Sequence, residues 1–140
     1  MAAVAEALGR MPCLESLDCG GNSAIGPAGW EALATAMPQM SALRILYAGA
    51  CGMDDTGASA LAAGLPHAQA LKTLYLQYNS IANAGARSLT KALPCCLKLT
   101  NLELFGNRYD HREKGLLDAA GGTNVHINHE DPDDSSSEPD

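Results

Sequence analysis

The stretch Leu71-Lys72-Thr73-Leu74-Tyr75-Leu76-Gln77-Tyr78-Asn79 decides the fold. Its leucines stand at positions 71, 74 and 76, and an asparagine follows at position 79. The alternation around Leu74 and Leu76 predicts a short strand, with side chains directed in turn into a core and out to solvent. An asparagine side chain can bond backbone groups that a turn leaves free. The stretch therefore predicts one short strand that ends in a sharp turn.

The same pattern recurs along the chain at a nearly constant period. It starts at Leu14, Leu43, Leu71 and Leu99, so successive starts are 29, 28 and 28 residues apart. The turn position is filled in order by Asn22, Cys51, Asn79 and Asn107. After each of the first three turns a glycine precedes apolar residues at four-residue intervals, which predicts one face of a helix. Pro38, Pro66 and Pro94 follow these helices and are expected to end them. A repeat of this length predicts a solenoid of stacked strand–helix units.

The repeat resembles the ribonuclease-inhibitor-like class of leucine-rich repeats, as found in the sensor arms of NOD-like receptors and in the Ran GTPase-activating protein. The resemblance covers residues 1–120. It implies an α/β leucine-rich-repeat solenoid, a right-handed β-α superhelix forming a short horseshoe arc. Parallel strands would line the concave face and helices the convex face. The class serves many unrelated partners, so the resemblance implies an architecture and leaves the function open.

The repeat pattern divides the chain into four parts. Residues 1–13 are expected to form an N-terminal helix with Val4, Leu8 and Met11 at helical spacing, either a cap or a truncated repeat. Residues 14–120 hold the leucine-rich repeats. Residues 121–129 are expected to form a partial rung, because Val125-His126-Ile127 alternates like a short strand. Residues 130–140 contain no apolar side chain and are expected to be a disordered acidic tail.

Composition and motifs count against several classes of function. The net charge is −7, but six negative charges lie within residues 130–140, so the body is nearly neutral and lacks the basic face that nucleic acid needs. No apolar run is long enough for a membrane span. The five cysteines form no CxxC pair, which favours reduced thiols in a cytoplasmic protein. His126 and His129 are too few to hold a metal ion. No catalytic or cofactor-binding motif is present, so we expect neither a cofactor nor an enzyme.

Strand residues that face away from the core predict the binding surface. Tyr47 and Tyr75 should lie on adjacent strands, about 5 Å apart, and tyrosine suits interface anchors. The predicted partner-binding residues on the concave face are Asp18, Arg44, Ile45, Tyr47, Lys72, Tyr75, Gln77, Glu103 and Phe105. An alternative is that the tyrosine pair only stabilises the sheet. Trp30, at the start of a helix, is expected to pack between helices rather than to bind a partner.

Three functions follow from these observations. The first is a protein-interaction module that binds a protein or peptide partner through the concave face. The second is implied by the resemblance to the Ran GTPase-activating protein, which also has an acidic tail after its repeats: a regulatory protein that acts on a partner enzyme. The third is a structural piece of a larger scaffold, which associates with itself through the open ends of the solenoid.

Overall fold

The computed structural model describes residues 2–130, in which short strands alternate with helices. The helices are α1 (Ala2–Leu8), α2 (Gly26–Ala36), α3 (Asp55–Gly64), α4 (Asn83–Ala92) and α5 (His111–Gly121). The strands are β1 (Ser16–Asp18), β2 (Ile45–Tyr47), β3 (Thr73–Tyr75), β4 (Asn101–Glu103) and β5 (His126–Asn128). Three 3-10 turns that contain the repeat prolines follow α2, α3 and α4: η1 (Met37–Gln39), η2 (Leu65–His67) and η3 (Leu93–Cys95). Apart from Glu130, the predicted acidic tail lies outside the described residues.

The strands form one parallel sheet in the order β1-β2-β3-β4-β5. Each strand residue pairs with its equivalent in the next repeat. The central positions therefore align Leu17, Leu46, Leu74, Leu102 and Ile127 in one column that points into the core. A slip of one residue would turn this whole column toward solvent, so burial of the leucines fixes the register.

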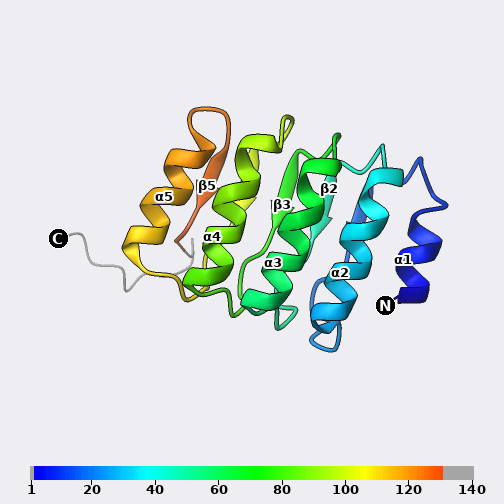
Figure 1. Ribbon diagram of the computed structural model, residues 1–140, viewed down its shortest axis with the longest axis horizontal. Coiled ribbons are helices and arrows are strands. Elements are labelled where there is room, and N and C mark those ends of the chain that lie inside the picture. Colours follow the sequence, from blue (N-terminus) through cyan, green and yellow to red (C-terminus); the bar gives the residue numbers. More distant parts are fainter. Residues whose placement is uncertain (1, 131–140) are drawn as a thin grey trace.

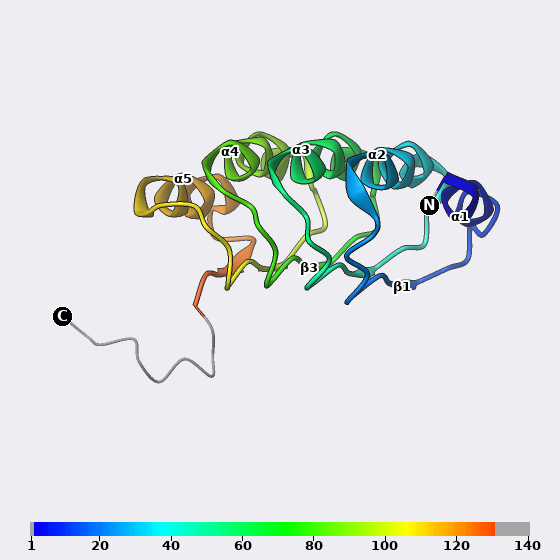
Figure 2. The same ribbon diagram turned by 90° about the horizontal axis from the view of Figure 1, so that it is seen from below.

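Helices and strands form two layers (Figure 1). Figure 2 shows the helices in one row and the strands in another, with α1 and α5 displaced toward the strand row, so that the helices lie on the outer side of a shallow arc. The helices contribute Leu33, Leu61, Leu89 and Leu117 to the core between the layers. The predicted fold class, an arc with parallel strands on one face and helices on the other, is confirmed. No helix among residues 2–130 is long and apolar enough to cross a membrane.

The side chains of Asn79 and Asn107 connect neighbouring repeats just after strands β3 and β4. Asn79 is only 6% exposed. Its amide nitrogen donates to the carbonyls of Ala48 (2.9 Å) and Leu76 (3.0 Å), and its Oδ1 accepts from the backbone amides of Cys51 (2.9 Å) and Met53 (3.0 Å). One side chain thus satisfies backbone groups of two successive turns, which would otherwise be buried without partners.

Cys51 occupies this position in the second repeat. Its thiol donates to the carbonyl of Cys19, 3.0 Å away. That bond corresponds to the one from Asn79 to Ala48, so the substitution keeps a donor toward the preceding repeat. Sulfur is a weak acceptor compared with an amide oxygen. The junction between the first two repeats is therefore held by weaker side-chain bonds than the junction that Asn79 forms.

The residue before each of these side chains has a left-handed backbone. Gly21 and Gly106 have φ angles of 77° and 76°, which cost glycine little. The same position holds Ala50 (φ 53°) and Tyr78 (φ 55°) in the middle repeats. A left-handed residue other than glycine costs about 1–3 kcal/mol and persists only where its surroundings impose it. Tyr78 is thus held in a conformation that the turn, rather than the side chain, favours.

Carboxylates satisfy the amides at the helix N-termini, some of them on a neighbouring helix. Asp54 accepts from the amide of Gly57 (2.9 Å) and caps its own helix α3. Asp55 accepts from the amide of Ala82 (2.7 Å), the residue just before α4, and from the amide of Gly85 (3.0 Å) in the first turn of α4. These bonds fix adjacent repeats to each other on the helix side, as the asparagines do at the strand ends.

The first helix differs in detail from its predicted helical face. Leu8 is buried as expected, and Ala5 is buried with it. Val4 lies in α1 but is 50% exposed, and Met11, which is 48% exposed, lies beyond the end of the helix. The reason is that α1 ends at Leu8, before Met11, and turns the side that carries Ala5 and Leu8 toward α2 and the core.

The last helix replaces the repeat glycine with Glu113, which is 2% exposed. Its Oε1 accepts from Arg87 Nε on α4 at 2.9 Å. In the earlier repeats this position packs tightly: a Cβ atom at Gly57 would lie 2.9 Å from Cδ1 of Trp30. Trp30 is itself buried against that glycine, as an inter-helix packing residue. The ion pair between Glu113 and Arg87 takes the place of this close packing between α4 and α5.

Candidate functional site

The sheet face that points away from the helices carries two columns of side chains. The third residues of the strands align Asp18, Tyr47, Tyr75, Glu103 and Asn128. The first residues align Ser16, Ile45, Thr73, Asn101 and His126. All of these side chains are exposed or half-buried. The register that buries the leucines therefore also sets the order of groups on the open face.

Tyr47 and Tyr75 form the apolar centre of this face. Their ring centroids are 4.7 Å apart and their planes differ by 9°, so the rings stack. The spacing matches that between neighbouring strands, about 4.8 Å, because the two residues pair directly across β2 and β3. Both side chains are half-buried, and each offers a flat apolar ring with a hydroxyl group that can form a hydrogen bond.

Charged side chains surround the stacked rings in two groups. Asp18 and Glu103 flank the tyrosines in the same column, and Asp18 Oδ1 accepts from the amide of Gly20 at 2.8 Å. Arg44 and Lys72 lie just before β2 and β3, and both are exposed. Arg44 is 4.0 Å from Glu15, a weak surface pair. Acidic groups thus continue the line of the rings, and basic groups lie at the strand starts.

Gln77 follows β3, two residues after the stacked ring of Tyr75. Gln77 lies over Gly49, since a Cβ atom there would be 2.8 Å from Gln77 Nε2. Its Oε1 is buried and has no hydrogen-bond partner among the described residues. The side chain of Gln77 therefore covers the backbone at Gly49, which has no side chain of its own, beside the two tyrosines.

A second aromatic pair lies where the strands end. Tyr78 and Phe105 meet edge to face, with ring centroids 5.3 Å apart and planes at 86°. The absence of a side chain at Gly106 makes room for this contact, because a Cβ atom there would lie 2.5 Å from Cδ1 of Tyr78. Phe105 was among the predicted site residues, whereas Tyr78, which is 51% exposed, was not. The sequence feature that could have identified Tyr78 is its position in the repeat, because a tyrosine there aligns with Gly21 and Gly106 of other repeats.

Tyr109, His129 and Asp118 form a hydrogen-bonded chain that the sequence did not predict. Tyr109 Oη is 2.5 Å from His129 Nδ1, and His129 Nε2 is 2.8 Å from Asp118 Oδ1. Burial, followed by the charge of Asp118, raises the pKa of Tyr109 far above its usual value. The phenol therefore stays protonated and fixes His129 against α5, which is a structural task. No local motif links positions 109, 118 and 129.

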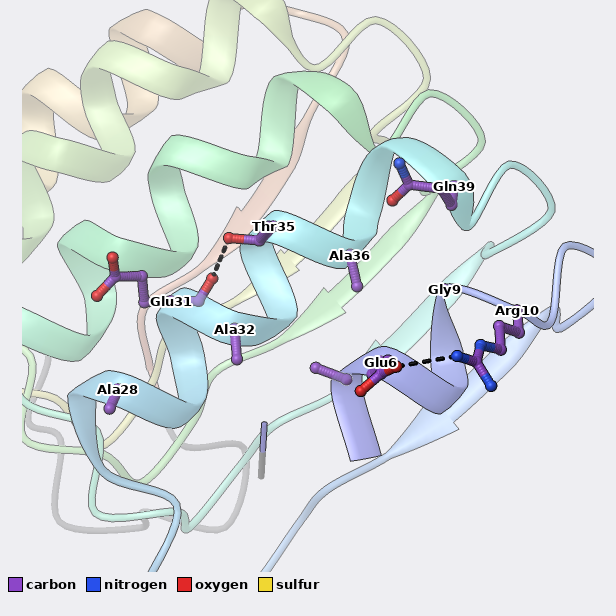
Figure 3. Close-up of a pocket in the computed structure, with 10 residues that line it drawn as sticks. Glu6, Gly9, Arg10, Ala28, Glu31, Ala32, Thr35, Ala36 and Gln39 are labelled. Carbon is purple, nitrogen blue, oxygen red and sulfur yellow. Dashed lines mark hydrogen bonds and ion pairs between the residues drawn. The ribbon is translucent and has the colours of Figure 1, made fainter. Parts of the chain in front are cut away.

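A groove of about 580 Å³ separates α1 from α2. Figure 3 shows small side chains such as Ala28, Ala32 and Ala36 along α2 facing Glu6 on α1 and Arg10 in the turn after it. Glu6 and Arg10 are 2.9 Å apart and both are well exposed. The groove offers a small apolar strip beside an ion pair, and none of its lining side chains has a buried polar atom without a hydrogen-bond partner.

The cysteines are free thiols, and they differ in how accessible they are to solvent. Cys19 and Cys51 are buried and Cys96 is half-buried, while Cys13 and Cys95 are exposed. Burial, with smaller effects from neighbouring Cys51 and Asp18, raises the pKa of Cys19 to about 11. A thiol is nucleophilic as its thiolate, so this shift suppresses its chemistry. Within residues 2–130 no cluster of three or more His, Cys, Asp or Glu side chains could hold a metal ion.

Comparison with known proteins agrees with the geometry of the repeats. A family model described as "Leucine Rich repeat" matches residues 67–89, which contain the stretch that decides the fold. The structure is similar to that titled "Leiomodin-1 Actin-Binding Site 2", with a TM-score of 0.77 and 15% sequence identity over 94% of this chain and 79% of that one. The fold is a leucine-rich-repeat arc.

A second solved structure has the same fold. It is the C-terminal domain of tropomodulin from Caenorhabditis elegans, with a TM-score of 0.72 and 10% identity over 94% of this chain and 85% of that one. No curated protein sequence matches the chain. At these identities the likeness concerns the arrangement of strands and helices, so the leucine-rich-repeat arc is common to all three.

Proposed function

We propose that this leucine-rich-repeat arc is a protein-interaction module that binds a protein or peptide segment across the open face of its sheet. The stacked pair of Tyr47 and Tyr75, half-exposed at the centre of that face, is the observation that carries the proposal. Interfaces gain most of their binding energy from a few aromatic anchors. The unit length and the helical outer layer support the resemblance to the ribonuclease-inhibitor-like class of repeats.

The charges on the face favour a partner segment with a basic residue beside an apolar anchor. Asp18 and Glu103 lie in line with the rings, so a segment running across the strands meets a carboxylate on either side of the aromatic centre. Arg44 and Lys72 favour an acidic residue at the border of the segment. The name of the leiomodin-1 structure supports the proposal in general terms, because it assigns actin binding to a domain of this fold.

A selection from random peptides tests this proposal, because it does not require the partner to be identified first. A displayed library of peptides about twelve residues long, enough to span the five strands at about 4.8 Å each, is selected on the full chain. We expect enriched peptides that place Lys or Arg next to a large apolar residue. Titration calorimetry of one such peptide should show an affinity at least tenfold weaker for Tyr47→Ala, which corresponds to about 1.4 kcal/mol.

Carboxylate-to-amide substitutions provide a matched control. Glu103→Gln should weaken binding and reduce its dependence on salt, because the lost carboxylate faces the bound segment. Glu31→Gln makes the same change at an exposed position of helix α2, away from the sheet face, and should leave the affinity unchanged. Equal affinities for Tyr47→Ala, Glu103→Gln and Glu31→Gln would contradict binding on the sheet face.

The alternative role of the tyrosine pair is to stabilise the sheet. In that case Tyr47→Ala would lower the unfolding free energy, while peptides selected on the folded protein would bind to the variant with unchanged affinity. Binding and stability measured on the same variant therefore separate the two roles. Nothing in the geometry of residues 2–130 favours stimulation of a partner GTPase over simple binding.

A further inference from the structure

The described residues place a helix at one end of the arc and a strand at the other. At one end, helix α1 packs against α2 but has no strand of its own beside β1 among the described residues. At the other end, strand β5 pairs with β4, and no described helix follows it. Figure 1 shows these two half-repeats at opposite ends of the row. A helix that lacks a strand and a strand that lacks a helix together make one complete repeat.

The free backbone groups at the two sheet edges are in matching register. The amide of Ile45 on β2 donates a hydrogen bond to the carbonyl of Glu15 beside β1. The amide of Leu104 after β4 donates to the carbonyl of Asn128 on β5. The equivalent amides at the open edges are those of Ser16 on β1 and of His129 after β5. By the same pattern Ser16 N–H would donate to the carbonyl of Val125 in another molecule, as His126 N–H donates to Thr100.

The N-terminal end also holds a hollow where a strand of another molecule would lie. This hollow has a volume of about 350 Å³, and Val4, Leu17 and Ile25 supply its apolar wall. Leu17 belongs to the buried column of the sheet, which ends at Ile127 on β5. A second copy whose β5 pairs with β1 would place its Ile127 level with Leu17 and fill the hollow with the next member of that column.

The helices of the two ends fit the same arrangement. Between α3 and α4, Ser88 faces Ser59, and their hydroxyl oxygens are 3.1 Å apart. The equivalent positions are Ala3 on α1, which precedes Leu14 by the same distance as Ser88 precedes Leu99, and Gly115 on α5, two repeats after Ser59. Ala3 is exposed, and a Cβ atom at Gly115 would meet nothing within 4 Å. The exposed alanine of one copy would therefore pack against the open glycine of the other.

We propose that this chain associates head to tail with further copies of itself, β5 of one copy pairing with β1 of the next and α1 of the second copy covering that strand. The contact joins two different surfaces, so it does not close on itself and can repeat along a line. Its product is a longer leucine-rich-repeat arc in which the face that carries Tyr47 and Tyr75 recurs in every copy. The binding proposed for that face is independent of this association.

Sedimentation velocity of the full chain over a concentration series tests the proposal. We expect the average mass to rise past the dimer without a plateau. Ser16→Pro removes the edge amide and is tolerated at the first residue of an edge strand. Gly115→Arg fills the open space on α5 without a contact inside the same molecule. Each variant keeps one working end, so each alone should stay monomeric, and an equimolar mixture should stop at a heterodimer.

Controls make the outcome decisive. Ala63→Arg adds the same side chain on an exposed position of α3, away from both ends, and should associate like the unmodified chain. Circular dichroism should show that all variants are folded. A chain that is monomeric throughout the series, a plateau at the dimer, or a mixture of the two variants that does not associate would each overturn the proposal.

Discussion

Replacement of Asn79 by alanine tests how much the side-chain bonds between repeats stabilise the arc. The substitution removes four hydrogen bonds of 2.9–3.0 Å, two donated to carbonyls and two accepted from amides. Each buried group left without a partner costs about 1–3 kcal/mol. Relaxation and water at the neighbouring turn reduce the sum, so we expect a loss of about 4 kcal/mol, near the upper end for a single substitution.

Urea denaturation followed by circular dichroism measures this loss. The slope of the unfolding free energy against urea concentration should stay constant while the urea concentration at the unfolding midpoint falls, as expected when only stability changes. Asn124→Ala, at an exposed position of the last turn, serves as the control and should change the free energy by less than about 0.5 kcal/mol. Asn79→Cys should recover part of the loss, since Cys51 shows that a thiol keeps the bond to the preceding repeat. A loss below about 1 kcal/mol for Asn79→Ala would refute the reasoning.

Three further predictions concern packing, charge and protonation. Gly57→Ala should destabilise the protein by about 1–3 kcal/mol and shift the fluorescence of Trp30, because the added carbon would lie 2.9 Å from the indole; an unchanged emission spectrum would argue against this contact. Arg87→Ala should lower the melting temperature, because the buried carboxylate of Glu113 loses its cation; the same melting temperature in Arg87→Ala and the unmodified chain would mean that water replaces the guanidinium. The pKa of the Cys19 thiol is raised from 9.0 to about 11, so its contribution to the unfolding free energy is complete below pH 9 and should be lost as the pH rises toward 11. Cys19→Ser should flatten this alkaline decline in urea titrations at several pH values, and a decline as steep as in the unmodified chain would assign it to other groups.

The sequence was sufficient to predict the fold class because equivalent positions of successive repeats pair with each other, so the repeat pattern also sets the register of the strands. Once Leu46 and Leu74 are assigned to the core, the pairing of Tyr47 with Tyr75 follows from alternation along the strand. The stacking angle of 9° does not follow, because it depends on side-chain rotations that alternation leaves free. Whether the aligned residues of this face bind a partner stays a prediction.

Contacts between distant or irregular segments could not be predicted. The hydrogen-bonded chain of Tyr109, His129 and Asp118 joins the loop before α5, helix α5 and the segment after the last strand, and no period relates these positions. The bonds from Asp55 to the amides at the N-terminus of α4 depend on how two helices lie side by side. The exposure of Met11 depends on where α1 ends, and helix ends are poorly determined by apolar spacing alone.

The thiol of Cys51 affects where partial unfolding of the arc should stop. In a linear array each unit is stabilised mainly by its immediate neighbours, so unfolding can begin at one end and stop at a weak junction. The junction bridged by Cys51 is such a point, because it lacks the strong acceptor that Asn79 provides one repeat later. Amide hydrogens in β1 and α2 should then exchange with solvent together and faster than those of β3 and α4. The first repeat would detach as a unit while the remaining arc keeps its structure.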